Sequence, residues 1–145
     1  MEEKDLSTVC EIENNSFQNP WSPITFLGEI QNDSISFPYV IVSRKNKMIV
    51  GYIICWYIKD EVQISNIAVH PDYRRKGLAE MVLHSVIEKF EENGARDFVL
   101  EVRPSNLPAL SLYKKMGFKV LRIRENYYHN PREDALVMKK SLEKR

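Results

Sequence analysis

The sequence is poor in cysteine and has no long apolar run. Its two cysteines, Cys10 and Cys55, cannot build a disulfide framework, and both stand among apolar neighbours, so we expect reduced thiols in a core. The longest apolar run, 48–58, is far below the roughly 20 residues that a membrane-spanning helix needs. The segment Met1–Asp5 lacks the basic start and apolar stretch of a secretory signal. We therefore expect a single cytoplasmic domain over residues 1–145.

An excess of charge of one sign is also missing. The chain carries 21 basic and 20 acidic side chains, a formal net charge of +1, which argues against attraction of nucleic acid to the whole surface but leaves a local basic patch open. We expect no direct nucleic-acid partner and, with no long apolar run, no membrane partner. No Cys/His spacing fits zinc and no acidic loop fits calcium, so no metal is predicted. With 43% hydrophobic and 28% charged residues, the composition is that of a globular domain, and it leaves the oligomeric state open.

The hydrophobic pattern predicts an α/β (α+β) fold, with a mixed central sheet of about six strands flanked by about four helices. The predicted helices cover 6–16, 23–32, 77–93 and about 106–116, and the predicted strands cover 39–43, 48–58, 62–69, 98–102, 118–126 and 135–140. The unit from 62 to 102 should form a right-handed parallel crossover.

Three local features of these elements are also expected. Asp5 should cap the first helix, and Gly51 should bend or bulge its strand. The third helix should turn one face to the core: Leu78, Val82, Val86 and Phe90.

A basic turn stands between a predicted strand and a predicted helix. It consists of Arg74, Arg75, Lys76, Gly77, Leu78 and Ala79, in the pattern Arg-x-x-Gly-x-Ala. A helix N-terminus offers unpaired N–H groups and the positive end of the helix dipole, which suits a pyrophosphate. A solvated basic turn is an equal alternative, and Glu80 would repel an anion if it faced the same way.

Two side chains are candidates for acid–base chemistry. In the strand over 98–102, Glu101 lies on the face opposite the apolar residues, and a partly buried carboxylate suits a general base. In the following helix Asn106 and Tyr113 share a face, and the Tyr113 hydroxyl can donate a proton. The alternatives are a rim carboxylate paired with Arg103 or another base, and a core tyrosine whose hydroxyl has a hydrogen-bond partner.

Taken together, these segments resemble the GNAT acetyltransferases. The resemblance rests on Ile67–Val69, Arg74–Ala79, Leu100–Asn106, Leu112–Tyr113 and Gly117–Phe118, in the family's order. Two further segments are similar to the group that acetylates the alanine of a ribosomal protein and to archaeal N-terminal acetyltransferases: Asn19–Ser22 followed by Phe26, and Asn126–Tyr128 followed by Glu133–Ala135. The family's first strand is expected to be truncated or absent.

The resemblance implies transfer of acetyl from acetyl-CoA to a protein N-terminus, most closely the N-terminal alanine of a small-subunit ribosomal protein. It implies that Glu101 is the base and Tyr113 the acid. The implied cofactor-binding residues are Ile67, Ala68, Val69, Arg74, Arg75, Lys76, Gly77, Leu78, Ala79, Glu80 and Asn106. The implied substrate-binding residues are Trp21, Phe26, Tyr127 and Tyr128, which could instead be packing residues. A lysine or small-amine acetyltransferase and a non-catalytic acyl-CoA sensor remain alternatives.

Overall fold

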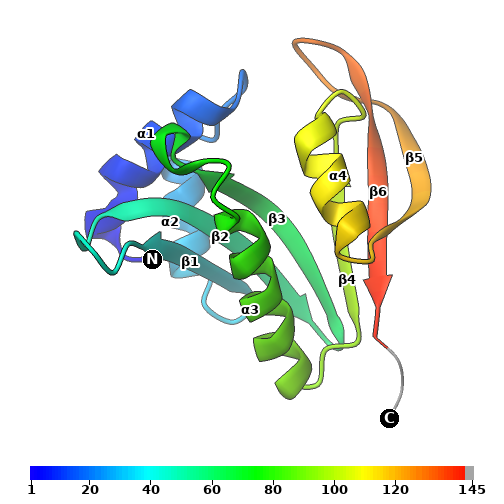
Figure 1. Ribbon diagram of the computed structural model, residues 1–145, viewed down its shortest axis with the longest axis horizontal. Helices are drawn as coiled ribbons and strands as arrows, with labels where there is room; N and C mark the ends of the chain where they lie inside the picture. The colour runs from blue at the N-terminus through cyan, green and yellow to red at the C-terminus, as the bar shows by residue number, and fades with distance from the viewer. Residues whose placement is uncertain (143–145) are drawn as a thin grey trace.

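The computed structural model describes residues 1–142, in which four α-helices pack on a six-stranded sheet (Figure 1). The helices are α1 (Leu6–Ser16), α2 (Pro23–Gln31), α3 (Leu78–Glu92) and α4 (Leu107–Lys115). The strands are β1 (Ser36–Val42), β2 (Ile49–Ile58), β3 (Glu61–Val69), β4 (Asp97–Val102), β5 (Lys119–Tyr128) and β6 (Glu133–Ser141). Two short 3-10 turns, η1 (Glu3–Asp5) and η2 (Pro71–Tyr73), complete the described elements.

The strands lie in the order β1-β2-β3-β4-β6-β5. Neighbouring strands are antiparallel except β3 and β4, which are parallel and are joined through α3. The predicted mixed sheet and its crossover are therefore confirmed. Within residues 1–142 no strand precedes α1, so the sheet starts at β1.

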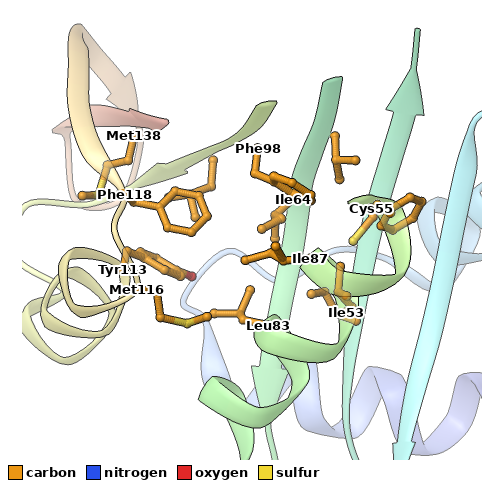
Figure 2. Packing of buried hydrophobic residues seen from close by; sticks show 14 of the residues in the cluster. Ile53, Cys55, Ile64, Leu83, Ile87, Phe98, Tyr113, Met116, Phe118 and Met138 are labelled. Atoms are coloured by element: carbon orange, nitrogen blue, oxygen red, sulfur yellow. The ribbon is translucent and has the colours of Figure 1, made fainter. Parts of the chain in front are cut away.

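Each face of the sheet carries a pair of helices. On one face α3 and α4 cover the larger core, where Leu83 and Ile87 meet Phe98 and Met138 (Figure 2). On the other face α1 and α2 cover a smaller core built around Tyr52. β2 is thus buried on both sides, which explains its long apolar run.

The buried face of α3 differs from the expected one. Val86 and Phe90 are buried as predicted, but Leu78 and Val82 are only half-buried. The remaining core positions belong to Leu83 and Ile87, which are buried. A strict four-residue spacing drifts around a helix of 3.6 residues per turn, whereas alternating steps of three and four stay on one face.

Side-chain caps fix the N-termini of α2 and α4 where the sequence places them. Ser22 Oγ accepts from the N–H of Thr25, and Asn106 Oδ1 accepts from the N–H of Ala109. The prediction for Asp5 was wrong. Asp5 has helical backbone angles, and its carboxylate accepts from the N–H of Glu2, so it closes η1 instead of capping α1.

Two irregularities bend the centre of the sheet. Gly51 pairs with Ile41 whereas Ile49 pairs with Val42, so the bulged residue is Val50, next to the predicted position. A Cβ on Gly51 would lie 2.7 Å from the carbonyl oxygen of Ala68, so only glycine lets β2 approach β3 this closely. The second irregularity shapes the functional site.

Candidate active site

The parallel pair β3–β4 separates halfway along its length. Its ladder runs from Glu61–Asp97 to Ile64–Leu100 and goes no further. At the same point β3 has its bulge, because Ile64 pairs with Cys55 while Asn66 pairs with Ile54. Figure 1 shows the two strands diverging beyond this point. A cleft of about 870 Å³ opens between them.

The cleft brings together many of the predicted site residues. The lining includes Trp21, Ile67, Glu101, Asn106, Tyr113, Tyr127 and Tyr128. Three other groups lie outside it: Phe26, the pair Ala68–Val69 and the turn 74–80. Phe26 is fully buried, with its ring 5.3 Å from Trp21 and 5.5 Å from Tyr52, so it supports the cleft wall from behind.

Glu101 faces the cleft because side chains alternate along β4. Leu100 and Val102 point into the core, while the Glu101 side chain, 16% exposed, lies on the opposite face. The alternative named Arg103 or another base as its partner, and the structure shows another base: Arg124 Nη1 lies 3.1 Å from Glu101 Oε1. Arg103 instead pairs with Glu133 at 3.3 Å.

Tyr113 stands between the core and the cleft. It is 7% exposed, its ring centroid lies 5.8 Å from that of Phe118, and it also lines the cleft. Figure 2 shows its hydroxyl pointing away from α4 toward the side of α3. Burial raises the pKa of Tyr113 to about 12, so the phenol keeps its proton at neutral pH.

The basic turn leads directly into α3. Arg75 and Gly77 both have positive φ, 63° and 75°. Gly77 is the N-cap residue of α3 and, because glycine has no side chain, it makes no side-chain capping bond. Within residues 1–142 no side chain caps the N-terminus of α3, so its first-turn N–H groups are available to a ligand. Arg74 anchors this turn, because its guanidinium donates to the carbonyl oxygen of Val69 and to Ser16 Oγ, both at 2.9 Å.

The charge of Glu80 is neutralised from the neighbouring helix. Lys115 Nζ in α4 lies 2.7 Å from Glu80 Oε1, and this hydrogen bond lowers the pKa of Glu80. The carboxylate is thus turned toward α4, which reduces its expected repulsion of an anion at the turn.

The sequence reasoning missed Glu13, which is 1% exposed in α1. Its carboxylate accepts from the N–H of Trp21 at 2.8 Å, from Asn66 Nδ2 at 2.9 Å and from the Tyr52 hydroxyl. It thereby ties α1 to β2, β3 and the α1–α2 loop beside the cleft. Its position four residues after Val9, on the apolar stripe of α1, was a signal that could have identified it.

The β5–β6 hairpin is fixed against both sides of the cleft. From one side Asn19 Nδ2 donates to the carbonyl oxygen of His129 at 2.6 Å. From the other side Arg103 donates to the carbonyl oxygens of His129 and Pro131. Glu133 accepts from both the N–H and the hydroxyl of Ser105. The α1–α2 loop and the hairpin therefore meet across the cleft.

Among residues 1–142, no group of three or more His, Cys, Asp or Glu side chains is placed to hold a metal ion. None of the helices in this range is both long and apolar enough to cross a membrane.

Comparisons with known proteins agree on one family. A model of the acetyltransferase (GNAT) family matches residues 6–118. The ribosomal protein bS18-alanine N-acetyltransferase of Escherichia coli (strain K12) is 36% identical over 140 residues, covering 95% of this chain and 92% of that protein. A Bacillus subtilis (strain 168) protein, which carries the same name provisionally, is 41% identical over 135 residues, covering 93% of this chain and 88% of that protein.

A solved structure gives the same picture. The crystal structure of the ribosomal-protein-S18-alanine N-acetyltransferase from Escherichia coli superposes with a TM-score of 0.90 at 33% identity, covering 100% of this chain and 92% of that one.

Proposed function

Since this chain belongs to the GNAT acetyltransferase family, we propose that it transfers the acetyl group of acetyl-CoA to the N-terminal α-amine of a protein. The acceptor we propose is the N-terminal alanine of ribosomal protein bS18, the substrate in the name of the Escherichia coli relative. The observation that carries the proposal is the position of Glu101, at the first residue of β4 beyond its ladder with β3, in the wall of the cleft.

The cleft and the basic turn fit an acyl-CoA. The turn at 74–80 offers cations and uncapped N–H groups to a pyrophosphate. Residues Ile67–Val69 pair with β2 on one side only, which supports main-chain hydrogen bonds to the pantetheine arm on the other. Asn106 lies at the N-terminus of α4 in the cleft lining, where its amide can meet the same arm.

Acetyl-CoA supplies a thioester, which an amine attacks and an ammonium does not. The ionised Glu101 would take the proton of the substrate ammonium, directly or through a water. The neutral Tyr113 would donate a proton or a hydrogen bond to the departing thiolate, a role that its pKa of about 12 supports. An N–H group of the free edge at Ile67–Val69 would stabilise the negative charge that develops on the carbonyl oxygen.

The substrate chain would enter between the α1–α2 loop and the β5–β6 hairpin. Trp21 lines this region on one side, and Tyr127 and Tyr128 line it on the other. Phe26 acts through Trp21, on which its ring packs. The bridge from Asn19 to the carbonyl oxygen of His129 crosses the cleft. A free chain end can pass beneath such a bridge more easily than an internal loop, which favours an N-terminal acceptor over a lysine.

Mass spectrometry of acetyl transfer onto peptides tests the proposal. One set begins with a free N-terminal alanine, serine or methionine, including the first residues of bS18. The other set has a blocked N-terminus and an internal lysine. Each set is run with the wild type, with Glu101→Gln and with Glu125→Gln, a matched control at an exposed carboxylate of β5.

We expect transfer to the free N-terminus, greatest for alanine. Glu101→Gln should lower the rate by about 10²–10⁴-fold, the usual contribution of a general base, and Glu125→Gln should leave it unchanged. Transfer to lysine alone would overturn the proposed acceptor. Binding of acetyl-CoA without transfer to either peptide set would contradict the proposal and would favour a non-catalytic sensor or an enzyme that acetylates small amines.

A further inference from the structure

The carboxylate of Glu101 is held from a strand that is not its neighbour. β6 lies between β4 and β5, so the Arg124 side chain crosses β6 to reach Glu101. In the ladders Arg124 is opposite Ala135, and Glu101 is opposite Val137. Both β6 residues are buried, at 0% and 2% exposure. The ion pair at 3.1 Å therefore lies over an apolar floor, where water competes less for the charges.

Tyr127 completes a triangle with this pair. The Arg124 guanidinium lies 4.3 Å above the Tyr127 ring. Burial and the hydrogen bond that its hydroxyl donates to Glu101 raise the pKa of Tyr127. The ladder between β5 and β6 is interrupted between Arg124 and Tyr128, and Asn126 there has a φ of +51°. This kink brings Arg124 and Tyr127 to the same side of β5.

The charged side chains Arg103 and Glu13, which also lie near Glu101, have partners of their own. Arg103, two residues along β4, is bound to Glu133 and lies 4.3 Å above the Tyr128 ring. Across the cleft Glu13 is satisfied by its three donors. The other charged and titratable groups around the site are Arg122, Arg124, Tyr127 and Tyr128 of β5, Arg103 of β4, Lys139 and Glu133 of β6, Tyr113 of α4, His129 of the hairpin turn and Glu13 of α1. Arg122 is opposite Val137, the β6 residue that also pairs with Glu101, and Lys139 is paired with Asp97. Among residues 1–142, Arg124 is the one cation in an ion pair with Glu101.

We propose that Arg124 is a positioning residue for acetyl transfer, which holds the Glu101 carboxylate ionised and directed into the cleft before the substrate arrives. The role rests on the proposed function, in which Glu101 receives the proton of the substrate ammonium. Burial favours the neutral form of a carboxyl, and a neutral carboxyl cannot accept this proton. The arginine charge, 3.1 Å from the carboxylate, opposes this effect of burial.

The test compares the pH dependence of kcat/KM for the wild type, Arg124→Gln, Arg124→Lys and Arg122→Gln. Arg122 is a matched control, since it is an exposed arginine two residues away on the same strand. Loss of the arginine charge should move the acid limb of Arg124→Gln upward by about one pH unit. This is the lower end of the usual range for an opposite charge in contact, because Arg124 is 45% exposed.

Below the limb, a shift of one unit appears as a loss of about tenfold in kcat/KM, while the plateau at higher pH changes far less. Arg124→Lys keeps a cation, so its acid limb should lie close to the pH of the wild-type limb. The acid limb of Arg122→Gln should lie at the same pH as that of the wild type. An unmoved limb in Arg124→Gln overturns the proposal. An equal loss at every pH shows that Arg124 only supports the fold, and an equal shift in Arg122→Gln shows an unspecific effect of surface charge.

A second measurement separates this proposal from the proposed function. The Glu101 carboxyl carbon is titrated by ¹³C NMR in the substrate-free protein, and its signal is assigned by its loss in Glu101→Gln. We expect its titration midpoint to rise in Arg124→Gln. If the midpoint rises but the wild type acetylates no peptide, the proposed function fails and the effect of Arg124 on Glu101 stands. An unchanged midpoint overturns the role of Arg124 whatever the activity.

Discussion

Replacing Glu13 tests how the wall of the cleft is held in place. This carboxylate is 1% exposed and accepts three hydrogen bonds, from Trp21, Tyr52 and Asn66. No cation is paired with it among residues 1–142, so its charge is stabilised by these donors. The perturbation is Glu13→Gln, which keeps the shape and replaces one acceptor oxygen by an NH₂ donor.

The size of the effect follows from the donors that lose their acceptor. A hydrogen bond to a charged group contributes about 1.5–3 kcal/mol, and a buried donor left unsatisfied costs about 1–3 kcal/mol. Part of this loss is offset, because the buried charge and its desolvation disappear as well. We therefore expect Glu13→Gln to lower the free energy of unfolding by about 2 kcal/mol. Glu13→Ala, which removes all three acceptor contacts and leaves a cavity, should lower it by about 3–5 kcal/mol.

Urea unfolding followed by tryptophan fluorescence measures this change, with Glu11→Gln as the control. Glu11 is exposed on the same helix, and its substitution should change the free energy of unfolding by less than about 0.5 kcal/mol. The native emission of Glu13→Gln should also shift to the red, because Trp21 loses its backbone anchor. A destabilisation no larger than that of Glu11→Gln would refute the reasoning, since the carboxylate would then not hold the loop.

The remaining predictions concern a turn, the thiols and a buried phenol. Gly77→Ala should lose about 1–2 kcal/mol of stability and bind acetyl-CoA more weakly by calorimetry, because φ is +75° there. Gly28→Ala, in open space on α2, should gain about 0.5–1 kcal/mol. Burial raises the pKa of Cys55 to about 12, so iodoacetamide at pH 8 should modify the half-buried Cys10 and spare Cys55, as intact mass will show. Tyr113 keeps its proton up to about pH 12 when folded but loses it near pH 10 when unfolded. The free energy of unfolding should therefore fall between pH 10 and pH 12, and less steeply in Tyr113→Phe, as urea titrations will measure.

The parts of the fold set by local pattern could be predicted from the sequence. The strict alternation of β4 placed Glu101 opposite the core residues. The predicted helix ends at 93 and about 116 lie within one residue of the ends of α3 and α4, where Gly94 and Gly117 have positive φ. The errors are local too. Asp5 resembles a cap in sequence, but it continues the helical path out of η1.

The hydrogen-bond and ion-pair partners of the site residues could not be predicted from the sequence. The sequence could name only Arg103, two residues from Glu101, as a specific partner, whereas the actual one, Arg124, is 23 residues away in the chain. Its choice depends on the strand order β4-β6-β5, which no periodicity encodes. Glu13 shows the same limit, because its place on an apolar stripe was visible but its donors come from 8, 39 and 53 residues away.

The cleft and the placement of the base have one structural origin. The parallel register pairs Ile64 with Leu100, so the next pair would be Ser65 with Glu101. The bulge of β3 falls on Ser65 and ends the ladder there, while β4 keeps its pairing with β6 through Val102. β4 therefore stays fixed while β3 turns away. The first carboxylate beyond the ladder then faces the free edge of Ile67–Val69, which places a proton acceptor opposite the strand proposed to bind the acyl donor.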